Sequence, residues 1–337
     1  MKKSGKVLLI IAACLVSAGI FMIGASLFMG VSLTEPISVS HDFIPLVVTQ
    51  SEIVVSKSET EVLQDDSITS DQIRSLNISW TSGDVIILVT DDEKIGLSES
   101  SAAVLEDNFK MVKTVQGNEL IIQYMDKQII LGSVPSKTLT VHLPKSYAEE
   151  MQTIKVSTAS ADLTVSGVVA DKLIFDSASG NLEATDMVLN YLNADTTSGY
   201  ITVSGSLAGF RCDYTSGNVQ IVQNNSNCRA EVETTSGVIT LSGAYSEADL
   251  DTTSGDVAIS SFSALRELEI ETTSGNVTLT VPSGSAFELE FDTGSGKFIS
   301  DLPVSFRGDS YVFNKGGPEF EVSTASGSLT VLPYVEK

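Results

Sequence analysis

The chain has 337 residues, 42% hydrophobic and 19% charged, which is long and apolar enough to bury a sizeable core. Acidic residues number 43 against 20 basic ones, giving a formal net charge of −23 at pH 7. Such a charge repels nucleic acid and anionic lipid headgroups, so we expect no nucleic-acid partner and favour cationic ones. The alternative is that the acidic surface only keeps a secreted β-protein soluble.

The N-terminus carries a predicted membrane anchor. The segment Val7–Val31 has 25 residues and no charge, which exceeds the roughly 20 residues of a spanning helix. The basic residues Lys2, Lys3 and Lys6 precede it, and positive charge favours the cytoplasmic side. We therefore expect a single-pass protein of the cell membrane, with residues 1–6 cytoplasmic and the C-terminal domain extracellular.

Two alternatives to an uncleaved anchor stay open. A cleaved signal peptide would have an apolar region of about 7–15 residues, which is shorter than this one. The run Ile11–Cys14 looks like a bacterial lipobox, which would make Cys14 a lipidated N-terminus. However, apolar sequence continues to Val31, and this favours an ordinary Cys14 within a helix.

Between the anchor and the regular part of the chain, two segments are expected. Residues 32–75 are acidic and serine-rich and are interpreted as a stalk. Residues 76–153 are interpreted as an N-terminal cap, which contains one repeat-like unit at Leu76–Val85. A short helical stretch is expected around Ala102–Val112, followed by a hairpin at Val115–Ile122.

Residues 154–337 are dominated by an internal repeat. Across the whole chain, ten serines stand before a small residue between alternating apolar residues, and the seven consecutive intervals from Ala161 to Gly296 lie between 18 and 21 residues. The small residues are Gly83, Ala161, Gly180, Gly199, Gly217, Gly237, Gly255, Gly275, Gly296 and Gly327. A fixed period of this length is typical of a solenoid.

The pattern within each repeat defines the coil. Apolar residues alternate on both sides of the glycine, as at Leu250 and Val257 around Gly255, which indicates strands with one buried face. Glycine suits the corner because it reaches positive φ without steric cost. We predict an all-β protein, a parallel β-solenoid with coils of about 19 residues. The last interval is longer, and residues 301–320 are expected to form a loop or hairpin that covers the end.

One position of the repeat is acidic in seven successive coils. The carboxylates stand four residues before each glycine: Asp176, Asp195, Asp213, Glu233, Asp251, Glu271 and Asp292. Stacking would place them roughly 5 Å apart in a ladder. Such a ladder could bind cations or supply a carboxylate pair for glycoside cleavage. The alternative is structural, with each carboxylate accepting hydrogen bonds from its Thr-Thr-Ser corner.

Other candidates for chemistry are weaker. The run Asp292–Gly296 matches an aspartic-protease signature, but it falls in the repeat register and lacks a second copy of that loop. The two histidines, His41 and His142, have no metal-ligand spacing, and no cofactor motif is present. We therefore predict no catalytic residues, no metal, no cofactor and no enzymatic activity.

Threonines and cysteines also fall on the repeat. A threonine column could line a flat binding face or simply favour β-structure, and it comprises Thr196, Thr234, Thr252, Thr272, Thr293 and Thr324, with Trp80 and Tyr214 at the same offset. Outside the anchor there are only two cysteines, Cys212 and Cys228, at different points of the coil. This mismatch predicts free thiols, with Cys212 in the core.

The repeat units resemble a bacterial family called the putative adhesin domain, formerly a domain of unknown function. Members occur in Lia-type cell-envelope stress proteins and in membrane-anchored Firmicute proteins. The resemblance covers roughly residues 70–335 and rests on the Thr-Thr-Ser-Gly-Asp/Asn-Val units, on Trp80–Val85, and on Leu139–Pro144 leading into Ile154–Val156. It implies a right-handed parallel β-solenoid at the cell surface and carries no catalytic residues.

These observations favour a membrane-anchored extracellular β-solenoid acting as an adhesin or interaction module of the bacterial cell envelope. One alternative is a cell-envelope stress sensor or regulator that binds cationic peptides through its acidic surface. A less favoured one is a polysaccharide-active β-helix enzyme, which would need a break in the repeat and a unique carboxylate cluster. The expected partners are the membrane, through Val7–Val31, and a cationic or cell-envelope protein or peptide.

Overall fold

The computed structural model describes residues 59–62, 73–126 and 134–335. The predicted anchor, most of the stalk, Cys14 and His41 lie outside these ranges. Within them the chain is almost entirely β-structure, as predicted, with one short α-helix, α2 (Lys145–Ala148), and one 3-10 turn, Asp107–Phe109. No helix of the described part is both long and apolar enough to cross a membrane.

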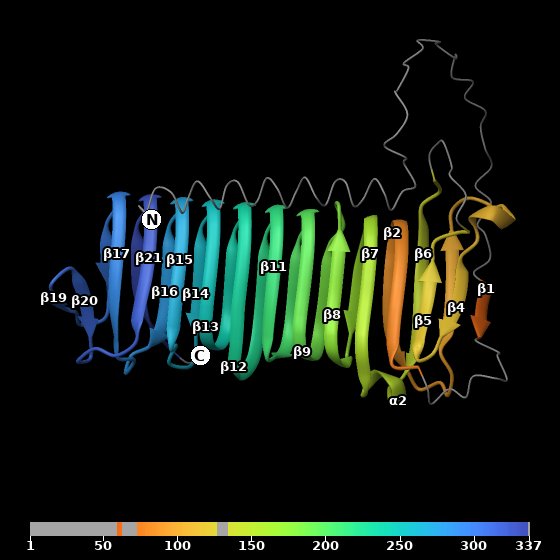
Figure 1. The fold of residues 1–337 in the computed structure, drawn as a ribbon, viewed down its shortest axis with the longest axis horizontal. Coiled ribbons are helices and arrows are strands. Elements are labelled where there is room, and N and C mark those ends of the chain that lie inside the picture. The colour runs from red at the N-terminus through yellow and green to blue at the C-terminus, as the bar shows by residue number, and fades with distance from the viewer. Residues whose placement is uncertain (1–58, 63–72, 127–133, 336–337) are drawn as a thin grey trace, which may run out of the picture.

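The strands form one elongated stack of coils (Figure 1). Each coil has two strand segments joined at the Ser-Gly corner, and each segment pairs in parallel with its counterparts in the coils beside it. The central strands are β7 (Met151–Ser166), β8 (Val169–Ser177), β9 (Leu182–Ser198), β10 (Ile201–Leu207), β11 (Gly209–Ser216), β12 (Val219–Ser236), β13 (Ile239–Ser254), β14 (Val257–Ser261), β15 (Glu267–Ser274) and β16 (Val277–Pro282). This confirms the predicted parallel β-solenoid.

The core runs along the inside of the stack. Inward residues of successive coils lie opposite one another, so that Leu250 is flanked by Val232 and Ile270, and all three are buried. A single coil cannot shield its apolar side chains from water, whereas a neighbour on each side can. Each inward residue therefore depends on contacts between residues far apart in sequence.

The corner glycines form a column in which backbone touches backbone. A Cβ on Gly237 would lie 1.5 Å from the carbonyl oxygen of Gly217, and the φ of Gly237 is +149°. Steric exclusion by the coil alongside is thus a second reason for glycine, beyond its access to positive φ. The same exclusion applies at Gly275 and Gly327, which have no left-handed backbone conformation.

The residue after each glycine connects one corner to the next. The side-chain oxygen of Asn218 accepts a hydrogen bond from the backbone N–H of Val238 at 3.0 Å, and that of Asp256 accepts one from Asn276 at 2.7 Å. The Asp or Asn in the repeat motif therefore binds the backbone of the adjacent coil, a role that was not predicted from the sequence.

At the N-terminal end, the order of coils differs from the order of the chain. Strand β2 (Ser75–Thr90) pairs in parallel with β7 on one side. On its other side it pairs with β5 (Glu119–Gln123) and β6 (Lys137–Pro144), which form a further coil. The segment expected to act only as a cap therefore also contributes coils.

Antiparallel strands cover this end of the stack. Strand β3 (Gly96–Ser101) pairs with β6, β4 (Val112–Gln116) with β5, and β1 (Glu59–Val62) with β3. The β4–β5 pair is the predicted hairpin, whereas β1 lies in the segment expected to be an irregular stalk. Of the expected helical stretch, only the turn Asp107–Phe109 is helical.

A buried lysine joins the cover to the coils. The Nζ of Lys137 lies 2.6 Å from a Glu99 carboxylate oxygen and 3.7 Å from the ring centroid of Tyr124, and the ring of Trp80 is also in contact. Burial lowers the pKa of Lys137, while Glu99 opposes that shift. The buried ammonium group is stabilised by this carboxylate, by the two aromatic rings, and by the backbone carbonyls of Phe109 and Tyr124, to which it donates hydrogen bonds.

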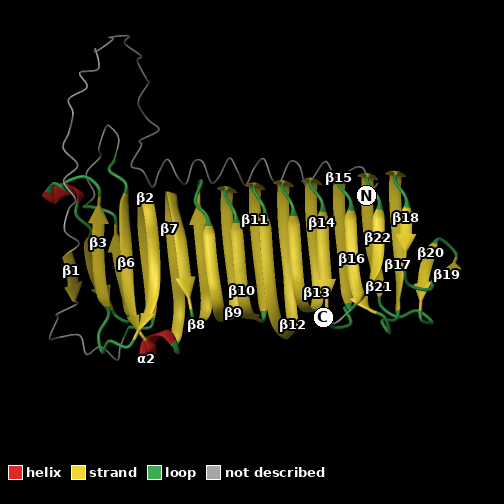
Figure 2. Ribbon diagram, turned by 180° about the vertical axis from the view of Figure 1, so that it is seen from behind, coloured by secondary structure: helices red, strands yellow, loops and turns green. Residues whose placement is uncertain are grey.

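The C-terminal end is also out of chain order (Figure 2). The last coil, β21 (Glu319–Ser326) and β22 (Leu329–Tyr334), lies between β15/β16 and the coil formed by β17 (Phe287–Ser295) and β18 (Phe298–Ser300). The predicted hairpin is present as β19 (Ser305–Arg307) and β20 (Ser310–Phe313), and β20 pairs antiparallel with β17.

Candidate functional site: an acidic face

The predicted carboxylate ladder is present, with one interruption. Asp176, Asp195, Asp213, Glu233, Asp251 and Glu271 lie opposite one another in consecutive coils. Because the last coil of the chain is inserted next to β15, Ser323 stands between Glu271 and Asp292. The expectation of seven adjacent carboxylates is therefore wrong: six are adjacent, and one coil separates the seventh, Asp292, from them.

Basic and polar side chains contact the carboxylates in the first part of the ladder. The Arg211 guanidinium lies 3.6 Å from Asp213 and 3.5 Å from Glu233, and it also contacts Glu231. Asn193 donates a hydrogen bond of 2.8 Å to Asp195. For Asp195 and Asp213, these partners belong to the strands and not to the Thr-Thr-Ser corner.

Towards the C-terminal end, the ladder widens into three acidic columns. We call this surface the acidic face, and its carboxylates are Glu231, Glu233, Glu247, Asp249, Asp251, Glu267, Glu269, Glu271, Glu288, Glu290, Asp292, Glu319 and Glu321. Only the column that contains Asp251 was predicted from the sequence. The other two follow from the same strand alternation, because every outward position of these strands repeats in each coil.

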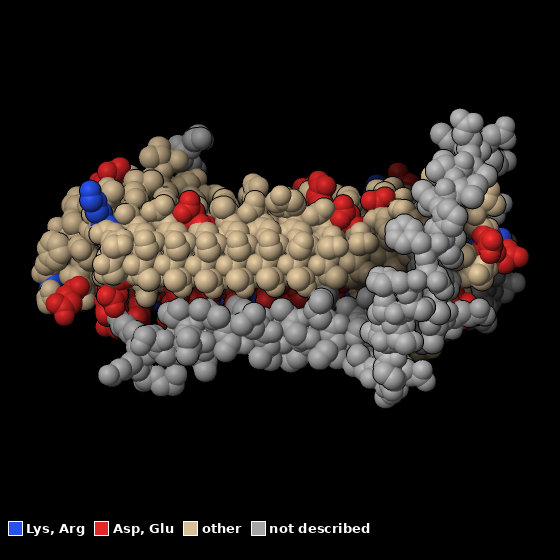
Figure 3. Space-filling view, turned by 90° about the horizontal axis from the view of Figure 1, so that it is seen from above, with Lys and Arg blue, Asp and Glu red and all other residues tan. Residues whose placement is uncertain are grey.

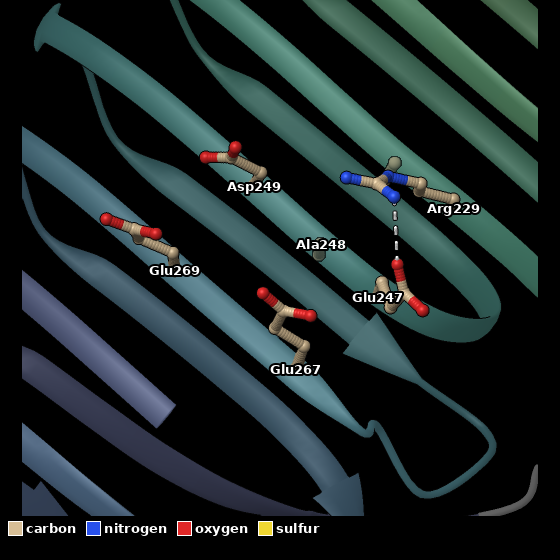
Figure 4. A pocket seen from close by; sticks show the side chains of 7 residues that line it. Arg229, Glu247, Ala248, Asp249, Glu267 and Glu269 are labelled. Carbon is tan, nitrogen blue, oxygen red and sulfur yellow. Dashed lines mark ion pairs between the residues drawn. The ribbon is translucent and has the colours of Figure 1, made fainter. Parts of the chain in front are cut away.

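A shallow hollow lies on the acidic face (Figure 4). Its charged lining includes Glu247, Asp249, Glu267 and Glu269, with Arg229 as the one basic residue. Arg229 lies 3.3 Å from Glu247, leaving the acidic side chains in excess. Ala230 and Ala248 also line the hollow.

Crowding of the carboxylates shifts their protonation. The pKa of Asp251 is raised to about 7, first by burial and then by the nearby charges of Asp249 and Glu271. The pKa of Asp213 is raised to about 6, first by burial and then by Glu233 and Asp195, although Arg211 opposes the shift. Near neutral pH the face therefore holds protons that isolated carboxylates would release.

We expect the stability of the protein to increase as the pH falls from 8 to 5. A folded-state pKa of about 7 for Asp251, above its ordinary value of 3.8, means that the folded state binds the proton more tightly. This stabilisation is complete below the unfolded pKa and is lost as the pH rises through the folded one. Thermal unfolding between pH 5 and 8 measures the effect.

The Asp251→Asn variant is the test of that assignment. It should melt higher than the unmodified protein at pH 8 and show a smaller change in melting temperature between pH 5 and 8. An unchanged pH profile in this variant would remove Asp251 as a source of the dependence.

The threonine column, Asp292 and the two cysteines were the other candidates from the sequence. The threonine column points inward, since Thr196, Thr234 and Thr252 are buried, so it forms no outer binding face. Asp292 stands in the repeat register, and the residue opposite it is Ser323 and not the second aspartate of a protease pair. Both Cys212 and Cys228 are free and Cys212 is buried, as predicted; Cys228 is also buried, which was not expected, and burial raises its pKa to about 12.

An uncharged strip lies over the corners. Figure 3 views the solenoid from the upper side of Figure 1 and shows a strip of uncharged side chains along its length. Acidic residues lie along the borders of this strip. Within the described ranges, no group of three His, Cys, Asp or Glu residues could hold a metal ion.

The fold and the repeated Thr-Ser-Gly corners define a parallel β-solenoid of regular coils. The model of the Toastrack DUF4097 family matches residues 73–332, and the chain belongs to this family. The resemblance inferred from the sequence is thereby confirmed. No curated protein matches the chain.

Several solved structures are similar in fold. A putative cell adhesion protein from Clostridium sporogenes is 12% identical, with 82% of this chain and 99% of that chain covered and a TM-score of 0.27. A putative adhesin from Bacteroides fragilis is 15% identical, with 82% and 97% covered and a TM-score of 0.41. A putative lipid binding protein from Parabacteroides distasonis is 15% identical, with 82% and 96% covered and a TM-score of 0.49.

Proposed function

We propose that this protein is a membrane-anchored binding module of the bacterial cell envelope that recognises a cationic partner through its acidic face. The observation that carries the proposal is the widening of one carboxylate column into three over β13, β15 and β17, with two of the three columns continuing over β21. A regular structural ladder would need only one column. Three adjacent columns create a strongly negative field over a rigid surface, which attracts cations from solution.

Burial is the main cause of the raised pKa of Asp251, and the nearby charges of Asp249 and Glu271 raise it further, which supports the same proposal. Like charges held close together destabilise one another, and a bound cation would relieve that repulsion. The protein keeps these carboxylates on a rigid stack, where they cannot move apart. A cationic peptide or protein with several lysines or arginines would match the spacing of about 5 Å between coils.

We expect a decalysine peptide to bind the full chain, with an affinity that weakens as salt rises, because exposed charges are screened beyond about 8 Å at physiological ionic strength. The variant Asp249→Asn/Glu267→Gln/Glu269→Gln should bind at least about tenfold more weakly, which corresponds to about 1.4 kcal/mol. Isothermal titration calorimetry at two salt concentrations measures both effects.

The matched control removes three carboxylates elsewhere. The variant Asp92→Asn/Glu93→Gln/Glu106→Gln makes the same change in net charge at exposed positions of the N-terminal end. It should bind nearly as well as the unmodified chain. Equal losses in both triple variants would mean that only net charge matters, and the acidic face would then not be the binding surface.

Membrane anchoring is the second part of the proposal and rests on Val7–Val31 and the preceding lysines. A cysteine introduced at the exposed residue Gln220 should react with a membrane-impermeant maleimide on intact cells. A cysteine introduced at Ser4 should react only after permeabilisation. The reverse labelling pattern would contradict an extracellular solenoid.

A further inference from the structure

The two ends of the solenoid are closed to different degrees. The N-terminal end is covered by β1, β3 and β4. At the C-terminal end, the hairpin β19–β20 pairs with β17. Strand β18 pairs with β22, and no other described strand lies along its second edge. The C-terminal end therefore presents an open strand edge.

Inward side chains near this edge are incompletely covered. Phe291 and Phe298 occupy core positions that are fully buried in β15 and β16, as at Ile270 and Val277, yet both remain partly exposed. Phe298 stacks on Tyr311 with ring centroids 3.8 Å apart, and Phe306 follows at 4.9 Å from Tyr311.

Two large apolar side chains are exposed beside these rings. Phe306 is 70% exposed and Ile299 is 48% exposed. Exposed apolar groups around an open strand edge are typical of a place where another strand adds.

The backbone of β18 is oriented for such an addition. Leu329 donates its N–H to the carbonyl of Lys297, and Asp301 donates its N–H to the carbonyl of Val331. Alternate residues of a strand direct their hydrogen-bonding groups to opposite sides. The N–H and C=O groups of Phe298 and Ser300 therefore face the open edge.

The sequence around Ile299 is complementary to itself. It reads Lys297, Phe298, Ile299, Ser300 and Asp301. If two copies pair antiparallel about Ile299, each Lys297 lies opposite Asp301 of the other copy, and Phe298 exchanges both backbone hydrogen bonds with Ser300. Neither Lys297 nor Asp301 forms an ion pair with another described residue.

We propose that the C-terminal end of the solenoid is a self-association surface, at which β18 pairs antiparallel with β18 of a second copy. A two-fold axis passes by Ile299. The exposed ring of Phe306 and the partly exposed rings of Phe298 and Tyr311 add apolar contact around the short strand pair. The charge pattern selects a second copy over an unrelated strand, because one antiparallel register satisfies Lys297 and Asp301 twice. Cation binding on the acidic face is not involved.

Charge exchange is the first test, performed on the full chain in detergent by sedimentation velocity over a range of concentrations. The unmodified protein should be a dimer that dissociates on dilution. Lys297→Glu should weaken the dimer at least tenfold, because two like-charged pairs replace two complementary ones, and Asp301→Lys should do the same. The double variant Lys297→Glu/Asp301→Lys restores opposite charges and should restore the dimer.

Cysteine cross-linking is the second test. Directly opposite residues that share no hydrogen bonds lie about 4.5 Å apart between Cα atoms, which suits a disulfide. Ile299→Cys in a Cys14→Ser background should therefore form a covalent dimer on mild oxidation. Gln220→Cys, on a strand paired on both edges, should not.

Either of two results would overturn the proposal. One is a chain that remains monomeric at every concentration, in which case Lys297 and Asp301 only protect the edge from pairing. The other is a dimer that is insensitive to Lys297→Glu and is not cross-linked by Ile299→Cys, which would place the contact elsewhere, for example in the anchor. Both readouts measure mass, so a failure of decalysine binding leaves them unaffected.

Discussion

Leu250→Asp is expected to unfold the coils around β13 and to lower the free energy of unfolding by more than about 4 kcal/mol. Leu250 is fully buried between Val232 and Ile270. An aspartate there loses the apolar contacts and leaves a carboxylate without a partner in the core. Circular dichroism during heating, together with limited proteolysis, would show the loss and locate it.

Ser260→Asp is the matched control for this substitution. Ser260 lies on an outward position of β14, opposite Ser242 and Thr280, so its new carboxylate remains in water. The change in stability should stay within about 1 kcal/mol. If Leu250→Asp melted like Ser260→Asp, the inward and outward assignments of these strands would be wrong.

Gly237→Ala is expected to destabilise the protein by about 3 kcal/mol or more, although it adds a single methyl group. The new Cβ would lie 1.5 Å from the Gly217 carbonyl oxygen, and the backbone has a φ of +149°. Relief requires a shift of the neighbouring backbone, which is itself paired with the coil beyond it. Chemical denaturation with urea measures the loss.

Gly284→Ala separates this effect from the general cost of replacing glycine. A Cβ on Gly284 meets no atom within 4 Å, and its backbone is not in the left-handed region. The stability of this variant should change by less than about 0.5 kcal/mol. Equal effects at Gly237 and Gly284 would contradict stacking as the reason for the glycine column.

The sequence by itself determined the coil. Each coil has the same local geometry, and this geometry leaves a repeated pattern in the sequence. The pattern consists of the spacing of the Ser-Gly corners, the alternation of apolar residues around them and the small residue at each corner. The same is true of the ladder from Asp176 to Glu271, because residues at equal offsets in consecutive coils stack directly. The two free cysteines and the core position of Cys212 followed from the same register.

Part of the candidate site was also accessible from the sequence. The column containing Asp251 was found, whereas the columns containing Asp249 and Glu267 were not. All three repeat with the same period, so reading every outward offset would have found them. The role of Asn218 and its equivalents required coordinates, since an amide in a corner has several possible partners and only the neighbouring coil selects one.

Only the tertiary structure decided the order of the coils at the two ends. The last coil lies next to β15 and places Ser323 between Glu271 and Asp292, and β2 lies between β7 and the coil of β5 and β6. Sequence periodicity specifies the conformation of each coil. It does not specify which coils are neighbours, because every coil presents a similar interface. That choice is made by long-range packing of cover strands, aromatic residues and the buried Lys137.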